Sequence, residues 1–210
     1  MKTKRKALLL SLCAVLIVVA SVMGTMAYLT STDTVTNTFT VGNVQIKLDE
    51  AAVNPDGTLV PNAERVKANS YKLLPGRTYI KDPTVTVKAG SESSYIKMTV
   101  TFSKAAELDA IFAPTGGANL TSIFNGYDST NWIAKGNTTA ANTRTYEFWY
   151  KETVAAPKAD VVLDALFDSI TVPDSITKEQ LATIEGMEIT VNAYAIQAAG
   201  FANAEEAWAA

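Results

Sequence analysis

The chain contains no histidine, and its 210 residues include a single cysteine, Cys13. Without an imidazole the protein has no Ser-His-Asp triad, no Cys-His pair and no His-ligated zinc of the HExxH type. One cysteine cannot form an intramolecular disulfide. The commonest hydrolase and zinc sites are therefore excluded, and stability has to come from a packed core.

The amino-terminal residues 1–27 have the pattern of a secretory signal peptide. An apolar run over residues 7–23 is followed by small residues that end in a Thr-x-Ala pattern at Ala27, which favours cleavage between Ala27 and Tyr28. The run is also near the lower length limit for crossing a bilayer, so an uncleaved anchor is the alternative. The positive patch before the run consists of Lys2, Lys4, Arg5 and Lys6.

Cleavage after Ala27 would remove four basic residues and no acidic ones, so that the formal net charge changes from -3 to -7. A secreted acidic protein has no electrostatic reason to bind nucleic acid. The remaining 183 of the 210 residues suffice for one domain with a sizeable core. We predict a secreted protein that is cleaved by a signal peptidase and contacts a membrane only through its signal segment.

Most of the mature chain has the period-two pattern of β-strands. The stretches 84–88 and 95–102 are rich in β-branched and aromatic residues and are separated by a turn-prone segment, which predicts a hairpin. Residues 54–57, Asn-Pro-Asp-Gly, predict a turn within a polar connection that runs to about Ser70. Further strands are predicted over residues 44–48, 132–134, 143–151, 161–172 and 187–198.

Two short helices complete the expected elements. Residues 175–185 contain good helix formers between a capping Ser175 and Gly186, and a second helix follows Asn203. Residues 104–112 suit a short helix as well as a strand. Eight or so strands with two brief helices predict an all-β fold, an antiparallel β-sandwich over residues 44–210, with the jelly-roll type preferred to an immunoglobulin-like one.

The amino-terminal tail, residues 28–43, begins with a Ser/Thr-rich stretch and then alternates. In an extended strand, the odd-numbered residues of this stretch fall on one side and the threonines fall on the other. The odd-numbered residues are Val35, Asn37, Phe39 and Val41. This segment is either an ordinary first strand paired within its own subunit or a donor strand that adds to an exposed sheet edge of a neighbour. The residues alone leave both readings open.

Several short motifs resemble the SipW-dependent signal-peptide proteins of Gram-positive bacteria, the family of TasA and of camelysin, or CalY. The resemblance covers both ends of the chain well and residues 104–185 poorly, and the signal junction is its most specific part. The motifs are residues 24–31, GTMAYLTS; Phe39, Gly42 and residues 44–49; residues 74–76, 82–87 and 94–97; and residues 193–197, 200–201 and 206–208.

The resemblance implies secretion through a dedicated signal peptidase and a jelly-roll subunit of extracellular fibres in the biofilm matrix. In such fibres the mature amino terminus of one subunit is inserted as a strand into the sheet of its neighbour. Head-to-tail contacts of this kind do not close on themselves and so propagate as filaments. We therefore expect self-assembly, or assembly with a related matrix protein, that involves residues 28–41.

Two enzymatic readings compete with this expectation. The camelysin branch of the family is described as a metal-dependent peptidase, but here a metal would have only carboxylate and water ligands, which suit calcium or magnesium better than a peptidase zinc. Two carboxylate pairs could serve glycoside hydrolysis, although exposed acids need no special explanation. These are Asp164 with Asp168 and Glu147 with Glu152. We predict no enzyme activity, no catalytic residue, no cofactor and no metal.

The aromatic stretch over residues 143–151 supports a third reading. Alternate side chains of a strand point to opposite faces, so Trp149 is a candidate exposed aromatic that could stack on a sugar or on a partner protein. Core packing is the default role for its neighbours. A monomeric carbohydrate- or protein-binding module at the cell surface is thus the alternative to a fibre protein, and loss of glycan retention in Trp149→Ala would distinguish it.

Overall fold

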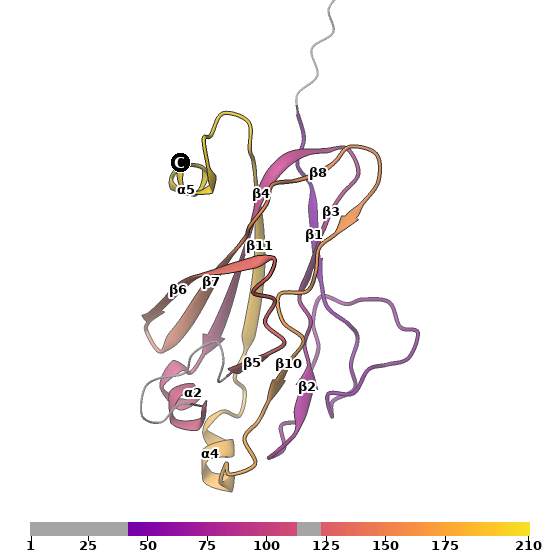
Figure 1. Ribbon diagram of the computed structural model, residues 1–210. Coiled ribbons are helices and arrows are strands. Elements are labelled where there is room, and N and C mark those ends of the chain that lie inside the picture. Colours follow the sequence, from indigo (N-terminus) through magenta and orange to yellow (C-terminus); the bar gives the residue numbers. More distant parts are fainter. Residues whose placement is uncertain (1–41, 113–122) are drawn as a thin grey trace, which may run out of the picture. The chain divides into compact units, whose positions relative to one another are not determined.

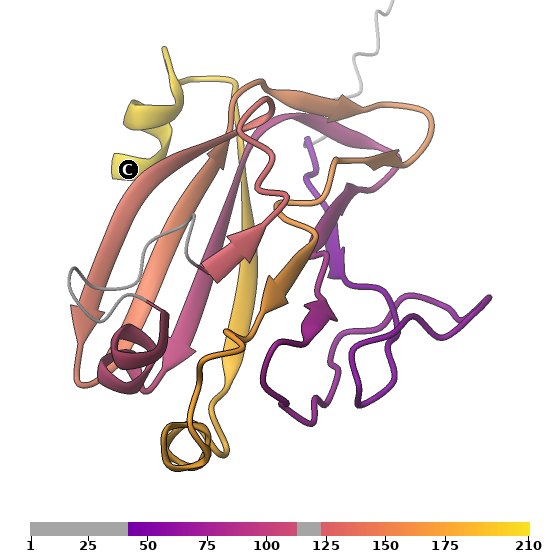
Figure 2. The ribbon, with the colours of Figure 1, turned by 60° about the horizontal axis from the view of Figure 1, so that its bottom comes forward.

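The computed structural model describes residues 42–112 and 123–210 of the chain. These residues form an antiparallel β-sandwich (Figures 1 and 2). One layer is a five-stranded sheet in the order β11-β4-β7-β6, with β8 paired to the start of β4, and the other layer consists of two three-stranded sheets, β1-β3-β9 and β2-β10-β5. The all-β sandwich expected from the sequence is confirmed.

The strands differ greatly in length. The two strands β4 and β11 lie side by side over nine residue pairs in the large sheet. The bounds are β1 Ile46–Asp49, β2 Thr78–Ile80, β3 Thr84–Val87, β4 Ser91–Ser103, β5 Phe124–Asn125, β6 Trp132–Ala140, β7 Thr143–Tyr150, β8 Val154–Ala156, β9 Val161–Val162, β10 Ser169–Thr171 and β11 Ile189–Gln197.

The predicted hairpin of residues 84–88 with residues 95–102 is wrong. β3 pairs with β1 and β9, whereas β4 pairs with β11, β7 and β8 in the opposite layer. A turn at Gly90, whose φ is 86°, carries the chain from one layer to the other. All four β3 residues are buried, so side chains on both faces of β3 are shielded from solvent. This burial is achieved in the second layer, between β1 and β9.

The predicted strand over residues 161–172 is two short strands in different sheets. β9 and β10 are separated by an irregular stretch in which Leu163, Leu166 and Phe167 are buried. The apolar residues of this run therefore belong to the core, but several of them lie in irregular backbone between the two strands. A short apolar run does not distinguish a continuous strand from buried irregular backbone.

Three short helices are present in the described residues, one more than predicted. The ambiguous residues 104–112 form α2, Ala105–Phe112, which an Arg144–Asp109 ion pair ties to β7. Helix α4, Lys178–Thr183, begins later than expected, with Thr177 and Gln180 forming a capping box. The expected cap at Asn203 is confirmed, and it precedes α5, Ala204–Ala209.

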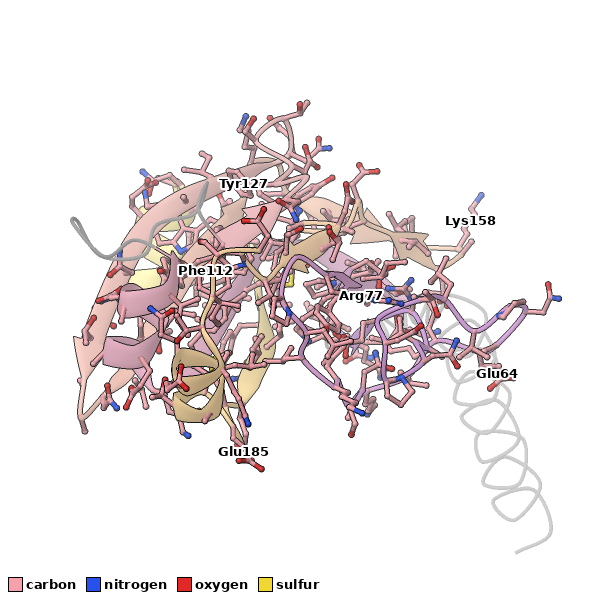
Figure 3. All side chains as sticks on the ribbon, turned by 90° about the horizontal axis from the view of Figure 1, so that it is seen from below. Glu64, Arg77, Phe112, Tyr127, Lys158 and Glu185 are labelled. Carbon is pink, nitrogen blue, oxygen red and sulfur yellow. The ribbon has the colours of Figure 1, made fainter. Side chains whose placement is uncertain are left out.

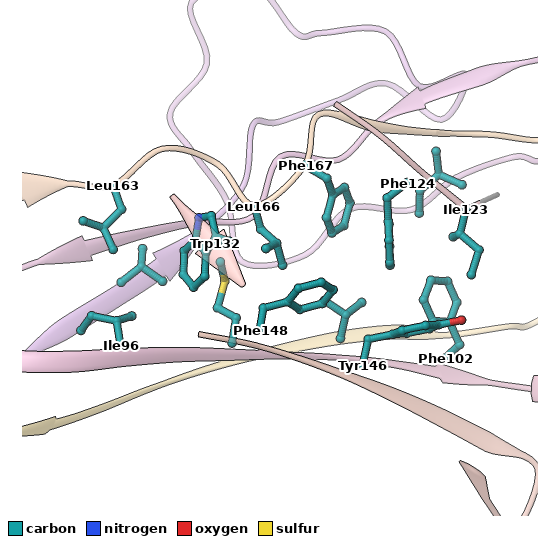
Figure 4. Packing of buried hydrophobic residues seen from close by; sticks show 14 of the residues in the cluster. Ile96, Phe102, Ile123, Phe124, Trp132, Tyr146, Phe148, Leu163, Leu166 and Phe167 are labelled. Carbon is teal, nitrogen blue, oxygen red and sulfur yellow. The ribbon is translucent and has the colours of Figure 1, made fainter. Parts of the chain in front are cut away.

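The main core lies between the two layers. Figure 4 shows Tyr146 and Phe148 of β7 reaching toward Phe124 and Phe167 from the opposite layer. The rings of Phe124 and Phe167 are 4.2 Å apart between centroids, and the ring of Tyr146 meets that of Phe124 edge-on at 5.8 Å. Inward positions of β4 are fully buried, at 0% exposure, as the period-two pattern requires.

The long connection between β1 and β2 has more structure than its polar sequence suggests. Isolated β-bridges join Glu50 to Val66 and Val53 to Leu59. The predicted turn at residues 54–57 is confirmed by a hydrogen bond from the Gly57 N–H to the Asn54 carbonyl at 2.8 Å. Seen from below, Glu64 and Arg77 lie in this connection, and Glu185 lies beside α4 (Figure 3).

Candidate functional site

A groove of about 1260 Å³ lies where one edge of each layer meets the other. Strand β1 forms one wall and the first three residues of β11, residues 189–191, form the other, and the two strands approach each other across the groove. Part of the β1–β2 connection and residues 184–188 complete the lining. The groove therefore opens between the two sheets of the sandwich, beside its core.

Both strands that flank the groove have an edge that no other described residue pairs with. Among the residues described, β1 pairs only with β3, and β11 pairs only with β4. The register of β11 with β4 runs without interruption from Ile189 opposite Phe102 to Gln197 opposite Ser94. A regular edge of this kind presents a row of unpaired N–H and C=O groups that can pair with a further strand.

The core is incompletely covered at the groove. The inward side chains of β1 and β11, including Ile46, Leu48, Ile189 and Val191, are only partly buried, although they pack against the main core. In the neighbouring strand β4, Ile96 is fully buried. An extended segment with apolar side chains at every second position could cover this strip and exclude water from it.

A charged network holds the end of β1 at the groove. The Arg65 guanidinium donates to Asp49 Oδ1 at 2.6 Å and to Asp82 Oδ2 at 2.8 Å, and Lys47 lies 2.7 Å from the second oxygen of Asp49. Burial alone would raise the pKa of Asp49, but the hydrogen bonds from Lys47 and Arg65 lower that pKa below its ordinary value of 3.8. This arrangement fixes where β1 ends.

A second polar cluster is buried in the wall of the groove. Lys81 Nζ donates to Glu50 Oε2 at 2.6 Å, and Asn69 Nδ2 donates to Glu50 Oε1 at 3.0 Å. Burial, and next the charge of Glu50, raise the pKa of the adjacent Tyr71 well above its ordinary value. Sequence reasoning missed this cluster because its members are spread over a segment that had only turn and polar signals.

Trp149 lies on the outer face of the five-stranded sheet, opposite in direction to the buried Phe148. Its indole is half-buried rather than free: Nε1 donates to Glu147 at 2.6 Å, Lys135 Nζ lies 4.1 Å from the ring centroid, and the Trp208 ring of α5 lies 6.3 Å away. The neighbouring side chains thus cover much of the surface that a sugar ring would need. The carbohydrate reading gains no support from this placement.

The carboxylate pairs weighed from the sequence have separate partners. Asp164 accepts a hydrogen bond from Asn131 at 3.0 Å, and Glu147 accepts the one from Trp149. Within residues 42–112 and 123–210, no group of three or more Asp, Glu, His or Cys side chains could hold a metal ion. Asp164 and Glu147 thus each have a hydrogen-bond donor of their own.

The predictions for the amino-terminal segment lie outside the described residues. They comprise the signal peptide, the cleavage between Ala27 and Tyr28, and the candidate donor residues Val35, Asn37, Phe39 and Val41. In the part of the chain that is described, none of the helices has both the length and the hydropathy to cross a membrane.

Comparisons with known proteins do not extend the motif resemblance. The resemblance is confined to short stretches near the two ends of the chain. No family model, no curated protein and no solved structure matches this chain.

Proposed function

We propose that this chain is a secreted structural protein, a subunit or accessory component of extracellular biofilm-matrix fibres, which assembles by amino-terminal strand exchange. In this proposal residues 35–41 of one copy enter the groove between β1 and β11 of the next copy. The observation that carries the proposal is that, among the described residues, β1 and β11 each pair on one side only, beside a partly covered core. A catalytic role is not part of the proposal.

The donor segment and the groove have complementary patterns. Val35, Phe39 and Val41 share one face of an extended strand and would cover the partly buried apolar side chains of β1 and β11, while the threonines would face solvent. At about 3.3 Å per residue, the seven residues 35–41 span about 23 Å. This length is within that of the nine-residue strand β11.

The course of the chain before β1 favours exchange between copies over pairing within one copy. The Asn43 carbonyl accepts from the Glu92 N–H at 2.9 Å and the Gln45 carbonyl accepts from the Lys88 N–H at 2.8 Å, so these residues follow the β3–β4 connection in line with β1. To reach the groove beside its own β1, the chain would have to reverse at or before Gly42. Such a reversal would use donor residues for the turn.

Exchange of this kind leads to a filament. The donor segment and the groove are different surfaces, so each added copy leaves one new free groove and one new free tail. The formal charge of -7 expected for the mature chain fits an extracellular location and gives no reason for contact with nucleic acid. Export would require the signal segment and its peptidase, with cleavage between Ala27 and Tyr28.

Electron microscopy of two purified chains at equal concentration tests the proposal. The chain that begins at Tyr28 should form fibres, and the chain that begins at Val44 should remain unassembled with the same β-rich circular dichroism spectrum. A matched pair of point variants sharpens the test: Phe39→Asp should block fibres, whereas Thr38→Asp, on the other face, should not. Fibres from the Val44 chain, or equal effects of the two variants, would contradict strand exchange.

A further inference from the structure

The buried cluster in the groove wall brings an amine and a carboxamide onto the same carboxylate. Glu50 accepts from Lys81 on one oxygen at 2.6 Å and from Asn69 on the other at 3.0 Å. Lys81 and Glu50 are each only 6% exposed. Lys81 is the one lysine of the described residues that is buried, so a reason for its position is needed.

The carboxamide of Asn69 is held in a polarised state. Its Oδ1 accepts a hydrogen bond from the Val53 backbone N–H at 3.1 Å, and its Nδ2 also donates to the Ala51 carbonyl at 2.9 Å. A backbone N–H aimed at a carbonyl oxygen stabilises negative charge that develops there during addition to the carbon. The assignment of oxygen and nitrogen in this amide follows from these partners.

A buried ion pair alone is a weak explanation for the cluster. The free energy needed to desolvate an ammonium and a carboxylate is about as large as the free energy gained from their attraction. Apolar residues can therefore often replace such a pair without loss of stability. Among the described residues, Glu50 is the side-chain acceptor for the ammonium group of Lys81, which has three protons to donate. Because Glu50 also accepts from Asn69 Nδ2, it is placed to carry a proton between the amine and the carboxamide.

We propose that Lys81 and Asn69 form an intramolecular isopeptide bond with Glu50 as the proton carrier. Glu50 takes a proton from Lys81, and the free amine attacks Cγ of Asn69, whose carbonyl electrons move to Oδ1 beside the Val53 N–H. Glu50 then gives its proton to Nδ2, the Cγ–Nδ2 bond breaks as the carbonyl re-forms, and the nitrogen leaves as ammonia. Ammonia takes the remaining proton from the new amide nitrogen, so ammonium is released and Glu50 is again ionised.

The bond would join the β1–β2 connection to the residue that follows β2. Residues 69–81 would become a covalent ring, which limits the unfolded chain as a disulfide does. The mature chain lacks cysteine and cannot use a disulfide for this purpose. This inference goes beyond fibre assembly, because the bond would be present in the monomer as well as in the fibre.

Mass spectrometry of the purified chain tests the proposal directly. The intact mass should be lower, by one ammonia, than the sequence and the observed amino terminus require. A tryptic digest should contain residues 68–72 joined to residues 78–88, with no cleavage after Lys81. Lys81→Arg, Asn69→Ala and Glu50→Gln should each abolish the joined peptide or reduce it by about 100-fold, the size of a typical general acid–base contribution.

The surface lysine Lys88, which pairs with Asp160, supplies the matched control. Lys88→Arg should keep the joined peptide. An unchanged mass in the unsubstituted chain overturns the proposal whether or not the variants fold. Loss of ammonia with separate peptides would also overturn it, because Asn69 followed by Ser70 can lose ammonia by closing a ring with its own backbone. Strand exchange would be unaffected by either negative result, so the two proposals can fail separately.

Discussion

The two edge strands of the five-stranded sheet differ in how they are protected from further pairing. Strand β6 has a register shift between Ala134 and Gly136, a charged residue, Lys135, at that point, and exposed side chains from Ile133 onward. Strand β11 has a continuous register over nine residues, and none of those residues is charged or a proline. Bulges and charges prevent edge-to-edge pairing, so β6 is blocked and β11 is open.

The β1-β3-β9 sheet of the opposite layer also has two edges that differ in length. Its far edge, β9, has only two residues, whereas its near edge, β1, continues into the residues that precede Ile46. Among the described residues, the unpaired edges of β1 and β11 therefore lie together at the groove, whereas β6 and β9 lie elsewhere. This difference between the edges is expected if the sandwich binds one additional strand, and binds it at the groove.

The largest expected effect is loss of assembly when a charge enters the groove. Val191→Lys places an ammonium among the partly buried side chains of β11 and should prevent fibres, because a bound donor strand would bury that charge without a partner. Ile133→Lys on β6, where the side chain is 43% exposed, should leave fibre formation unchanged. Electron microscopy gives the readout, and urea unfolding shows that each variant is folded.

A second test compares the closed core with the open groove. Phe148 is 0% exposed, so Phe148→Ala should lower the free energy of unfolding by about 4 kcal/mol through lost burial and a cavity. Val191→Ala in the unassembled chain should cost about 1 kcal/mol, because water already reaches its site. Equal losses in urea unfolding would show that the groove is as well packed as the core.

A third test concerns the connection that lines the groove. Gly57 has a φ of 85°, and a Cβ there would lie 2.8 Å from the Tyr79 Cα, so Gly57→Ala should cost about 3 kcal/mol from backbone strain and displacement. Gly90 has a similar φ of 86°, but a Cβ added there would meet no other atom within 4 Å. Gly90→Ala should therefore cost only the strain, about 1–2 kcal/mol. Thermal or urea unfolding that ranked the two in the opposite order would refute this account of the connection.

A fourth test concerns pH and the end of β1. The pKa of Asp49 is lower in the folded chain than its ordinary value of 3.8, so its ion pairs stabilise the fold above that pH and are lost as the pH falls through the folded pKa. Asp49→Asn should cost about 2 kcal/mol at neutral pH, the size of a hydrogen bond to a charged group, and less in acid. Urea unfolding between neutral pH and about pH 2.5 measures the difference, and a cost that is independent of pH would contradict it.

The sequence allowed the class of fold to be predicted but not the assignment of strands to layers. Alternation in residues 95–102 and 189–195 identified inward and outward side chains correctly, because each of these strands has one buried face. It could not tell that β3 and β4 separate at Gly90, since a turn between sheets and a hairpin turn use the same residue types.

The candidate site was predictable only in part. The pattern of residues 35–41 predicts a strand able to add to a sheet, and this prediction lies outside the described residues. The lack of charge in residues 189–197 could have indicated an edge strand that is not protected from pairing. The groove itself depends on which strands end up at the edges, which is a property of the whole topology. The cluster of Glu50, Asn69 and Lys81 had no local signal, because its members meet only through the fold of the β1–β2 connection.

Cysteine trapping in the chain that begins at Tyr28, which contains no cysteine, tests the central claim most directly. Chains with Phe39→Cys alone are mixed with chains that carry Val191→Cys alone, and the mixture is oxidised and analysed on a non-reducing gel. Strand exchange predicts disulfide-linked dimers that contain one chain of each kind, with Thr38→Cys in place of Phe39→Cys giving few. Absence of mixed dimers, together with an intrachain disulfide in the monomeric double variant, would show that the segment fills its own groove and would contradict the account.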